Sequence, residues 1–109
     1  MISIDDFKKV EIKVGEILSA EKVPETDKLL RLMVNFGEEK ARQVISGIAA
    51  FFPDPLQLVG KKCAFVTNLE PRIIRGFESQ AMVLAVGDSG ENFGLFYSDQ
   101  NIMPGATAR

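Results

Sequence analysis

The sequence predicts an all-β fold, a small barrel of five strands with a short helix between the third and fourth strands and a C-terminal extension. Two observations carry this prediction. Five segments alternate apolar and polar residues as half-buried strands do, and clusters of Gly, Pro, Asn and Asp separate them. The chain has 109 residues, fewer than an average domain, so we expect residues 1–109 to form a single domain.

The first elements are a short helical turn and a long strand. Ser3 is a suitable N-cap with Asp6 three residues later, the spacing of a capping box. Apolar and charged residues then alternate at the start of residues 10–23, which predicts the first strand. Gly15 marks a place where so long a strand bulges or bends.

The second and third strands form a predicted hairpin. Residues 29–37 and 41–48 both have the strand pattern, and the polar segment 37–40 turns the chain between them. In the second strand the apolar alternates are expected to face the core, and they are Leu30, Leu32, Val34 and Phe36.

The later elements complete the five strands. Asp54 as N-cap, Pro55 at the first helical position and Gly60 as a stop predict a short helix. Residues 61–69 and 81–87 are the fourth and fifth strands, and residues 92–99 add a hairpin strand or an edge.

The order of these elements is that of an OB-fold. Such a fold is a five-stranded, partly open Greek-key barrel whose second and third strands, with loops 1-2 and 4-5, bind oligonucleotides or oligosaccharides. Periodicity alone does not choose among barrel types, because small SH3-like barrels also have five strands. In the OB-fold, the segment "NLEPRIIRGFESQ" would be loop 4-5.

Composition narrows the function classes. The chain contains no histidine, which removes the usual neutral-pH general base and the commonest zinc ligand, so we expect no catalytic residue, no metal and no cofactor. Cys63 is expected to pack in the buried core rather than to act as a reactive thiol. The apolar runs are far shorter than the roughly 20 residues of a membrane span, and no signal-peptide pattern precedes them, so we expect a cytoplasmic protein.

The net charge of -2 hides a basic middle section. Residues 28–75 carry eight Lys or Arg against four Asp or Glu, whereas acidic residues outnumber basic ones in the segments on either side. A local basic face is therefore compatible with an acidic chain.

Five motifs together resemble the tRNA-binding domain family. They are, in order, "DFKKVEIKVGEI", "DKLLRLMV", "RQVISGIA", "VTNLEPR" and "ESQAMVLA". The family includes the appendix of many bacterial methionyl-tRNA synthetases, stand-alone tRNA-binding proteins and cofactors of eukaryotic synthetase complexes. The ending "NIMPGATAR" resembles the synthetase appendix, so we expect such an appendix, with a stand-alone protein as the alternative.

The resemblance implies an OB-fold that binds tRNA by shape, commonly as a homodimer, and assists a methionyl-tRNA synthetase without catalysis of its own. The alternative function is a chaperone-like or protein-interaction module of the same fold, because one branch of the family is described as binding unfolded polypeptides. An enzyme is not expected, since no serine has a histidine to activate it.

Basic residues in two loops and on the second and third strands are the main candidates for RNA binding. Lys28 lies in loop 1-2, and Arg31 and Arg42 are polar alternates of the two strands. Arg72 and Arg75 lie in loop 4-5, where a guanidinium can clamp a phosphate or lie against a base.

Neutral residues complete the candidate site. Asn68 is either a turn cap or an RNA contact, and Ser79 and Gln80 match the family's "SQGM" pattern for RNA contact, with Ala81 in place of its glycine. Alternation indicates that Met82 packs in the core, although the resemblance makes it a groove-lining candidate.

Two further expectations concern aromatic and apolar residues. The strand 2–3 face has no outward aromatic series for stacking successive bases, which predicts recognition of a folded RNA rather than of single strands. The C-terminal extension has more apolar residues than a small barrel needs, and they either form a dimer contact or cap the open end of the barrel. The dimer candidates are Phe93, Phe96, Tyr97, Ile102 and Met103.

Overall fold

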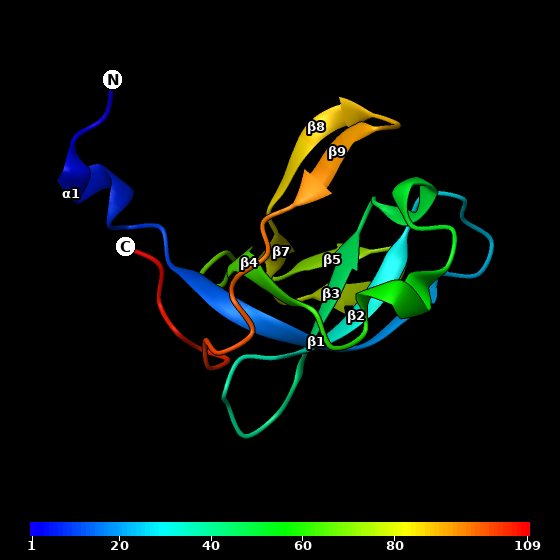
Figure 1. The fold of residues 1–109 in the computed structure, drawn as a ribbon, viewed down its shortest axis with the longest axis horizontal. Coiled ribbons are helices and arrows are strands. Elements are labelled where there is room, and N and C mark those ends of the chain that lie inside the picture. Colours follow the sequence, from blue (N-terminus) through cyan, green and yellow to red (C-terminus); the bar gives the residue numbers. More distant parts are fainter.

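The computed structural model describes residues 1–109 and shows a five-stranded antiparallel sheet curled into a nearly closed barrel (Figure 1). The strand order is β3-β2-β1-β4-β7, the arrangement expected of an OB-fold. The five strands are β1 (Ile12–Lys22), β2 (Leu30–Asn35), β3 (Arg42–Ser46), β4 (Lys62–Val66) and β7 (Met82–Val83). The predicted all-β fold class is confirmed.

Strand β1 is shared by both halves of the barrel and changes partner at Glu16. Its first part pairs with β4 and its second part with β2, and a register shift lies between Ile17 and Ser19. We expected a bulge or bend at Gly15, but the bulge lies between Ile17 and Ser19. An added Cβ at Gly15 would lie 2.5 Å from Val34 Cγ1, so the glycine lets core side chains pack against the backbone of β1.

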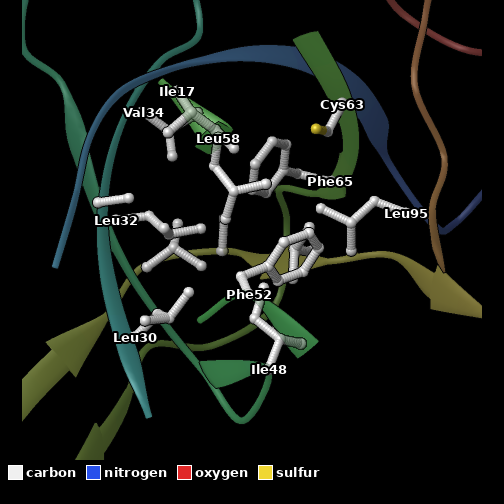
Figure 2. Close-up of a cluster of buried hydrophobic side chains, with 14 of the residues drawn as sticks. Ile17, Leu30, Leu32, Val34, Ile48, Phe52, Leu58, Cys63, Phe65 and Leu95 are labelled. Atoms are coloured by element: carbon white, nitrogen blue, oxygen red, sulfur yellow. The ribbon is translucent and has the colours of Figure 1, made fainter. Parts of the chain in front are cut away.

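The core lies inside the barrel and is built from the apolar alternates (Figure 2). In β2, Leu30, Leu32 and Val34 have no exposed surface, whereas the residues between them are partly exposed. Cys63 is fully buried, as predicted, and burial raises the pKa of its thiol to about 11. Leu69 is the last residue of the expected fourth strand, but it lies beyond the end of β4 and is exposed.

Three short helices complete the frame: α1 (Ile4–Phe7), η1 (Ala49–Phe51) and η2 (Pro55–Leu58). The Ser3–Asp6 capping box is present in α1, and the Asp54 carboxylate accepts a hydrogen bond from the amide of Leu56 at the start of η2. Element η2 is a 3-10 turn, and its Leu58 is buried in the core. No helix of the protein has the length and hydropathy needed to cross a bilayer.

Two small hairpins accompany the barrel: the first lies in a segment expected to be a loop, and the second contains the hairpin strand expected within residues 92–99. The segment expected to be loop 4-5 contains β5 (Arg72–Ile74) and β6 (Phe77–Ser79), which pair with each other. The segment expected to be the fifth strand divides into β7 and β8 (Ala85–Ser89), and β8 pairs with β9 (Asn92–Leu95) in a hairpin that projects from the barrel (Figure 1).

The C-terminal extension closes the barrel beside the first half of β1. The amide of Val14 donates to the carbonyl of Ala106 at 2.9 Å, and the amide of Gly105 donates to the carbonyl of Val14 at 2.7 Å. Gly37 and Gly105 both have positive φ, and the backbones of residues 36–37 and 104–105 pass so close that neither position has room for a side chain.

Candidate nucleic-acid interface

A groove runs between loop 1-2, residues 23–29, and the β5–β6 hairpin. Three adjoining cavities form it, and the largest measures about 450 Å³. Ile74, Arg75 and Phe77 line the hairpin side, and Arg31 lines one end. We call this the loop–hairpin groove. In an OB-fold these two connections are the ones that commonly contact ligands.

The loop wall of the groove is held by Thr26. Its hydroxyl donates to the carbonyl of Val23 at 3.0 Å and accepts from the amide of Leu29 at 3.4 Å, and the amide of Val23 donates to the carbonyl of Leu29. Hydrogen bonds within the loop therefore hold its two ends together and set the positions of its side chains in the groove.

The hairpin wall ends in a two-residue turn formed by Arg75 and Gly76. Both residues have positive φ, 53° and 84°, as a type I′ hairpin turn requires. The hairpin is tied to β3, because the side-chain amide of Gln43 donates to the carbonyl of Glu78 at 2.9 Å. The hairpin that carries Arg75 at its tip is therefore held in place by β3.

Arg31 and Phe77 form one end of the groove. The Arg31 guanidinium lies 5.8 Å from the centre of the Phe77 ring. It also donates to the carboxylate of Glu21 at 2.7 Å and to the side-chain carbonyl of Gln43 at 2.6 Å. This predicted RNA-binding residue therefore faces the groove but is partly occupied by protein partners.

Three of the five basic candidates are free of protein partners. Lys28, Arg72 and Arg75 are exposed and take part in no side-chain hydrogen bond or ion pair of the protein. Lys28 and Arg75 line the same cavity from opposite walls. Their unpaired charges make this part of the surface able to bind phosphate groups.

The guanidinium of Arg42 forms hydrogen bonds within the protein, which the sequence did not predict. Its guanidinium donates twice to the Glu38 carboxylate, at 2.9 and 2.7 Å, and to the carbonyls of Thr67 and Gln80, at 2.8 and 3.3 Å. Thr67 and Gln80 flank the segment that carries the β5–β6 hairpin. Arg42 therefore clamps the base of that segment, and we expect its replacement to lower the stability of the fold.

The side chains of Ser79 and Asn68 also form hydrogen bonds within the protein. Ser79 is 4% exposed, and its hydroxyl accepts from the amide of Ile45 and donates to the carbonyl of Ala81, so it has no surface to offer RNA. The Asn68 amide accepts from the backbone of Glu11 and donates to that of Lys9, which anchors the N-terminal segment. Because these partners lie 57 and 59 residues away in sequence, Asn68 is not a turn cap, and its contact with RNA stays a prediction.

Gln80 helps to close the barrel. Its side-chain oxygen accepts from the amide of Gln43 at 2.8 Å, and its own amide donates to the carbonyl of Gln43 at 2.8 Å. Met82 is 38% exposed whereas Val83 is buried, so the expected core position of Met82 is wrong. Met82 lines none of the three cavities of the loop–hairpin groove, and its contact with RNA stays a prediction. The buried alternates of this segment are Ala81 and Val83, one residue out of step with the expected pattern.

Sequence reasoning missed the groove partners Glu25, Thr26 and Phe77. Phe36 is buried as expected, so β2 and β3 present no aromatic series, but Phe77 supplies one ring from the hairpin. An Arg-Gly pair between Ile74 and Phe77 is the signal that could have revealed the two-residue turn and placed Phe77 on a strand.

The candidate dimer residues divide into two groups. Phe93 stacks on Phe51 with ring centres 3.7 Å apart, so it packs on the barrel, as the capping alternative proposed. Phe96, Tyr97 and Met103 are exposed, at 49%, 51% and 73%. Ile102 is half-buried, and its carbonyl accepts from the Lys62 ammonium.

No group of three or more His, Cys, Asp or Glu side chains comes together as metal ligands would.

The chain matches a family model over residues 12–107, and the model's description is "Putative tRNA binding domain". It is 55% identical over 82% of its length to the methionine–tRNA ligase of Methanoregula boonei, and 46% identical over its whole length to that of Methanosphaerula palustris. It spans only 13% and 16% of these two enzymes.

Solved structures of similar size share the fold. A MetRS-related protein from Pyrococcus horikoshii aligns with a TM-score of 0.91 at 36% identity, over 100% of this chain and 98% of the other. The chaperone CsaA from Bacillus anthracis aligns with a TM-score of 0.86 at 25% identity, over 100% and 99%. The family match covers nearly the whole barrel, and the chain therefore belongs to the tRNA-binding domain family.

Proposed function

We propose that this domain binds folded tRNA in and around the loop–hairpin groove, without catalysis of its own. The observation that carries the proposal is the set of free cations on two anchored, facing connections: Lys28 on the loop and Arg72 and Arg75 on the hairpin. Each such contact with a phosphate releases condensed counterions, so binding weakens as salt rises. Arg31 and Gln80 border the same region and contribute secondary contacts.

The groove favours a folded RNA over an extended single strand. Non-specific single-strand binders place several aromatic rings along the barrel face so that successive bases stack. Here Phe77 is the one aromatic residue of the groove, and it is half-buried beside Arg31. The RNA is therefore held by its backbone and a few exposed nucleotides.

The domain acts as a homodimer that assists a methionyl-tRNA synthetase in the cytoplasm, as an appendix of the enzyme or beside it. The likeness to methionine–tRNA ligases supports this assignment. The exposed Phe96, Tyr97 and Met103 supply apolar surface for a second copy. Two copies bind one tRNA more tightly than one, because the second contact is intramolecular.

The test is a titration with folded tRNA and with an unstructured RNA of equal length at two salt concentrations, with light scattering to count the chains. We expect folded tRNA to bind more tightly and both affinities to fall with salt. Absence of binding to either RNA would contradict the proposal, and equal affinity for the two would contradict recognition of a folded surface.

A second candidate function is the binding of apolar polypeptide segments. The likeness to the chaperone CsaA favours it, together with the exposed apolar residues of the C-terminal extension. Salt separates the two functions, because apolar peptide binding persists at high salt whereas RNA binding does not.

A further inference from the structure

Glu25 and Arg75 are the two non-glycine residues of the chain with clearly positive φ, at 65° and 53°. They lie on opposite walls of the loop–hairpin groove and line the same two cavities. A left-handed backbone at such a residue costs roughly 1–3 kcal/mol, and such positions gather at functional sites. Two of them, with opposite charges across one groove, point to a ligand that meets both side chains.

The largest cavity of the groove offers three kinds of surface. Lys28 and Arg75 are free cations, Glu25 and Asp27 are carboxylates outside every ion pair of the protein, and Leu29 and Ile74 are apolar. Its volume of about 450 Å³ lies within the range of small-molecule sites, roughly 300–1,000 Å³. A simple phosphate site has no use for the two carboxylates, since they repel an anion.

A nucleotide accounts for all three surfaces. Its phosphate binds cations, the faces of its base pack on apolar side chains, and the N–H groups at the edge of the base donate to carboxylates. An ionised carboxylate only accepts hydrogen bonds. Among the four bases, guanine presents two adjacent N–H donors on its Watson–Crick edge, whereas the others place an acceptor beside their donor.

We propose that the loop–hairpin groove holds one unpaired guanine nucleotide of the bound RNA, with its base edge on the carboxylates of Glu25 and Asp27 and its phosphate on Arg75 and Lys28. The proposal rests on the proposed RNA binding and adds a base preference to it. The domain then reads one exposed nucleotide in an RNA that it otherwise holds by the backbone.

The variant Glu25→Gln separates this proposal from general electrostatics by the sign of its effect. Removing a negative charge strengthens the binding of any phosphate-bearing ligand. Loss of a carboxylate that accepts from guanine weakens the binding of guanine nucleotides instead. The matched control is Glu39→Gln, which removes the same charge from an exposed position in the β2–β3 turn, outside the groove.

The experiment titrates the full chain with 5′-GMP, 5′-AMP, 5′-CMP and 5′-UMP at low salt and follows the backbone amide resonances of residues 23–29 and 74–77. We expect 5′-GMP to bind about fivefold or more tightly than the other three, and Glu25→Gln to lower its affinity by about fivefold. The same variant should leave 5′-AMP binding equal or stronger, and Glu39→Gln should leave the preference unchanged. Should Glu25→Gln unfold, Glu25→Asn replaces it, because asparagine tolerates a left-handed backbone.

A parallel tRNA titration keeps this proposal separate from the proposed function. Equal binding of the four nucleotides, or a rise in 5′-GMP affinity in Glu25→Gln, overturns the guanine assignment while tRNA binding stands. Resonance shifts confined to other parts of the chain overturn it as well. If tRNA itself does not bind, the proposed function fails.

Discussion

Arg42 and Glu38 form a doubly hydrogen-bonded ion pair, with Nε and Nη2 of the arginine 2.9 and 2.7 Å from the two carboxylate oxygens. The remaining amino group of Arg42 reaches the carbonyls of Thr67 and Gln80. One side chain thus joins the turn after β2 to both ends of the segment that carries the groove hairpin.

We expect Arg42→Ala to lower the free energy of unfolding by about 2 kcal/mol, because charged hydrogen bonds are lost and carbonyl groups are left without their donor. Urea unfolding measures this change. The control is Lys40→Ala, which removes the same charge two residues away from an exposed side chain without an ion pair and should change stability little. Equal stability of the two variants would contradict the clamp.

The pH dependence of stability should reflect Glu38 and Glu11. Hydrogen bonds from Arg42 and from the Thr67 hydroxyl, respectively, lower the pKa of these carboxyl groups below the ordinary glutamate value of 4.5. The unfolded chain therefore binds protons at higher pH than the folded one, so their stabilisation is complete above about pH 4.5 and is lost as pH falls through the lower folded-state pKa values.

The check is urea unfolding at a series of pH values from 7 to 3. We expect Glu38→Gln to show a shallower loss of stability on acidification than the unmodified chain. The matched variant Glu39→Gln should retain the original slope, because Glu39 forms no ion pair. A parallel decline in all three proteins would contradict the assignment.

Replacement of Arg75 at the tip of the groove hairpin should raise the stability of the fold and lower its affinity for tRNA. Asn adopts the left-handed conformation of a type I′ turn more readily than Arg, so Arg75→Asn should raise the free energy of unfolding by about 0.5 kcal/mol. It should also lower tRNA affinity about fivefold through the loss of a free guanidinium. Lys40→Asn is the charge-matched control for tRNA binding, and an equal loss of affinity in that variant would speak for net charge rather than the groove.

The close packing at Gly15 predicts a large effect of a single methyl group. Gly15→Ala should lower the free energy of unfolding by about 1–3 kcal/mol, because Val34 and its neighbours must move. Gly47→Ala is the control, since an added Cβ there meets nothing within 4 Å. Thermal or urea unfolding compares the two, and a neutral Gly15→Ala would show that the core yields more easily than its contacts indicate.

The proposed dimer surface is tested at Met103, which is 73% exposed. Met103→Glu should leave the fold intact and shift the proposed dimer towards the monomer in light scattering, because an interface that buries the new charge loses several kcal/mol or must rearrange. Leu56→Glu, at an exposed apolar residue on η2, is the control and should leave the dimer unchanged. An unaffected dimer in Met103→Glu would place the interface elsewhere.

The core-facing strand positions and the helix caps could be predicted from the sequence alone. Alternation in residues 29–37 placed Leu30, Leu32 and Val34 in the core because a strand has a period of two, and the structure confirms each. Capping residues Ser3 and Asp54 act on amides two or three residues away, so local spacing was enough to identify them. The free cations of the two groove walls were also among the candidates.

The contacts of the polar side chains, in contrast, depend on the folded barrel. Arg42 bonds to carbonyls 25 and 38 residues away, and the Ser79 hydroxyl bonds to an amide 34 residues away, so no local pattern separates these clamps from a proposed binding residue such as Arg75. The placement of Glu25 opposite Arg75 across the groove likewise depends on how two connections, distant in sequence, are brought together by the barrel. Periodicity records which side of a strand faces the core, but hydrogen bonding between distant segments depends on the closed fold.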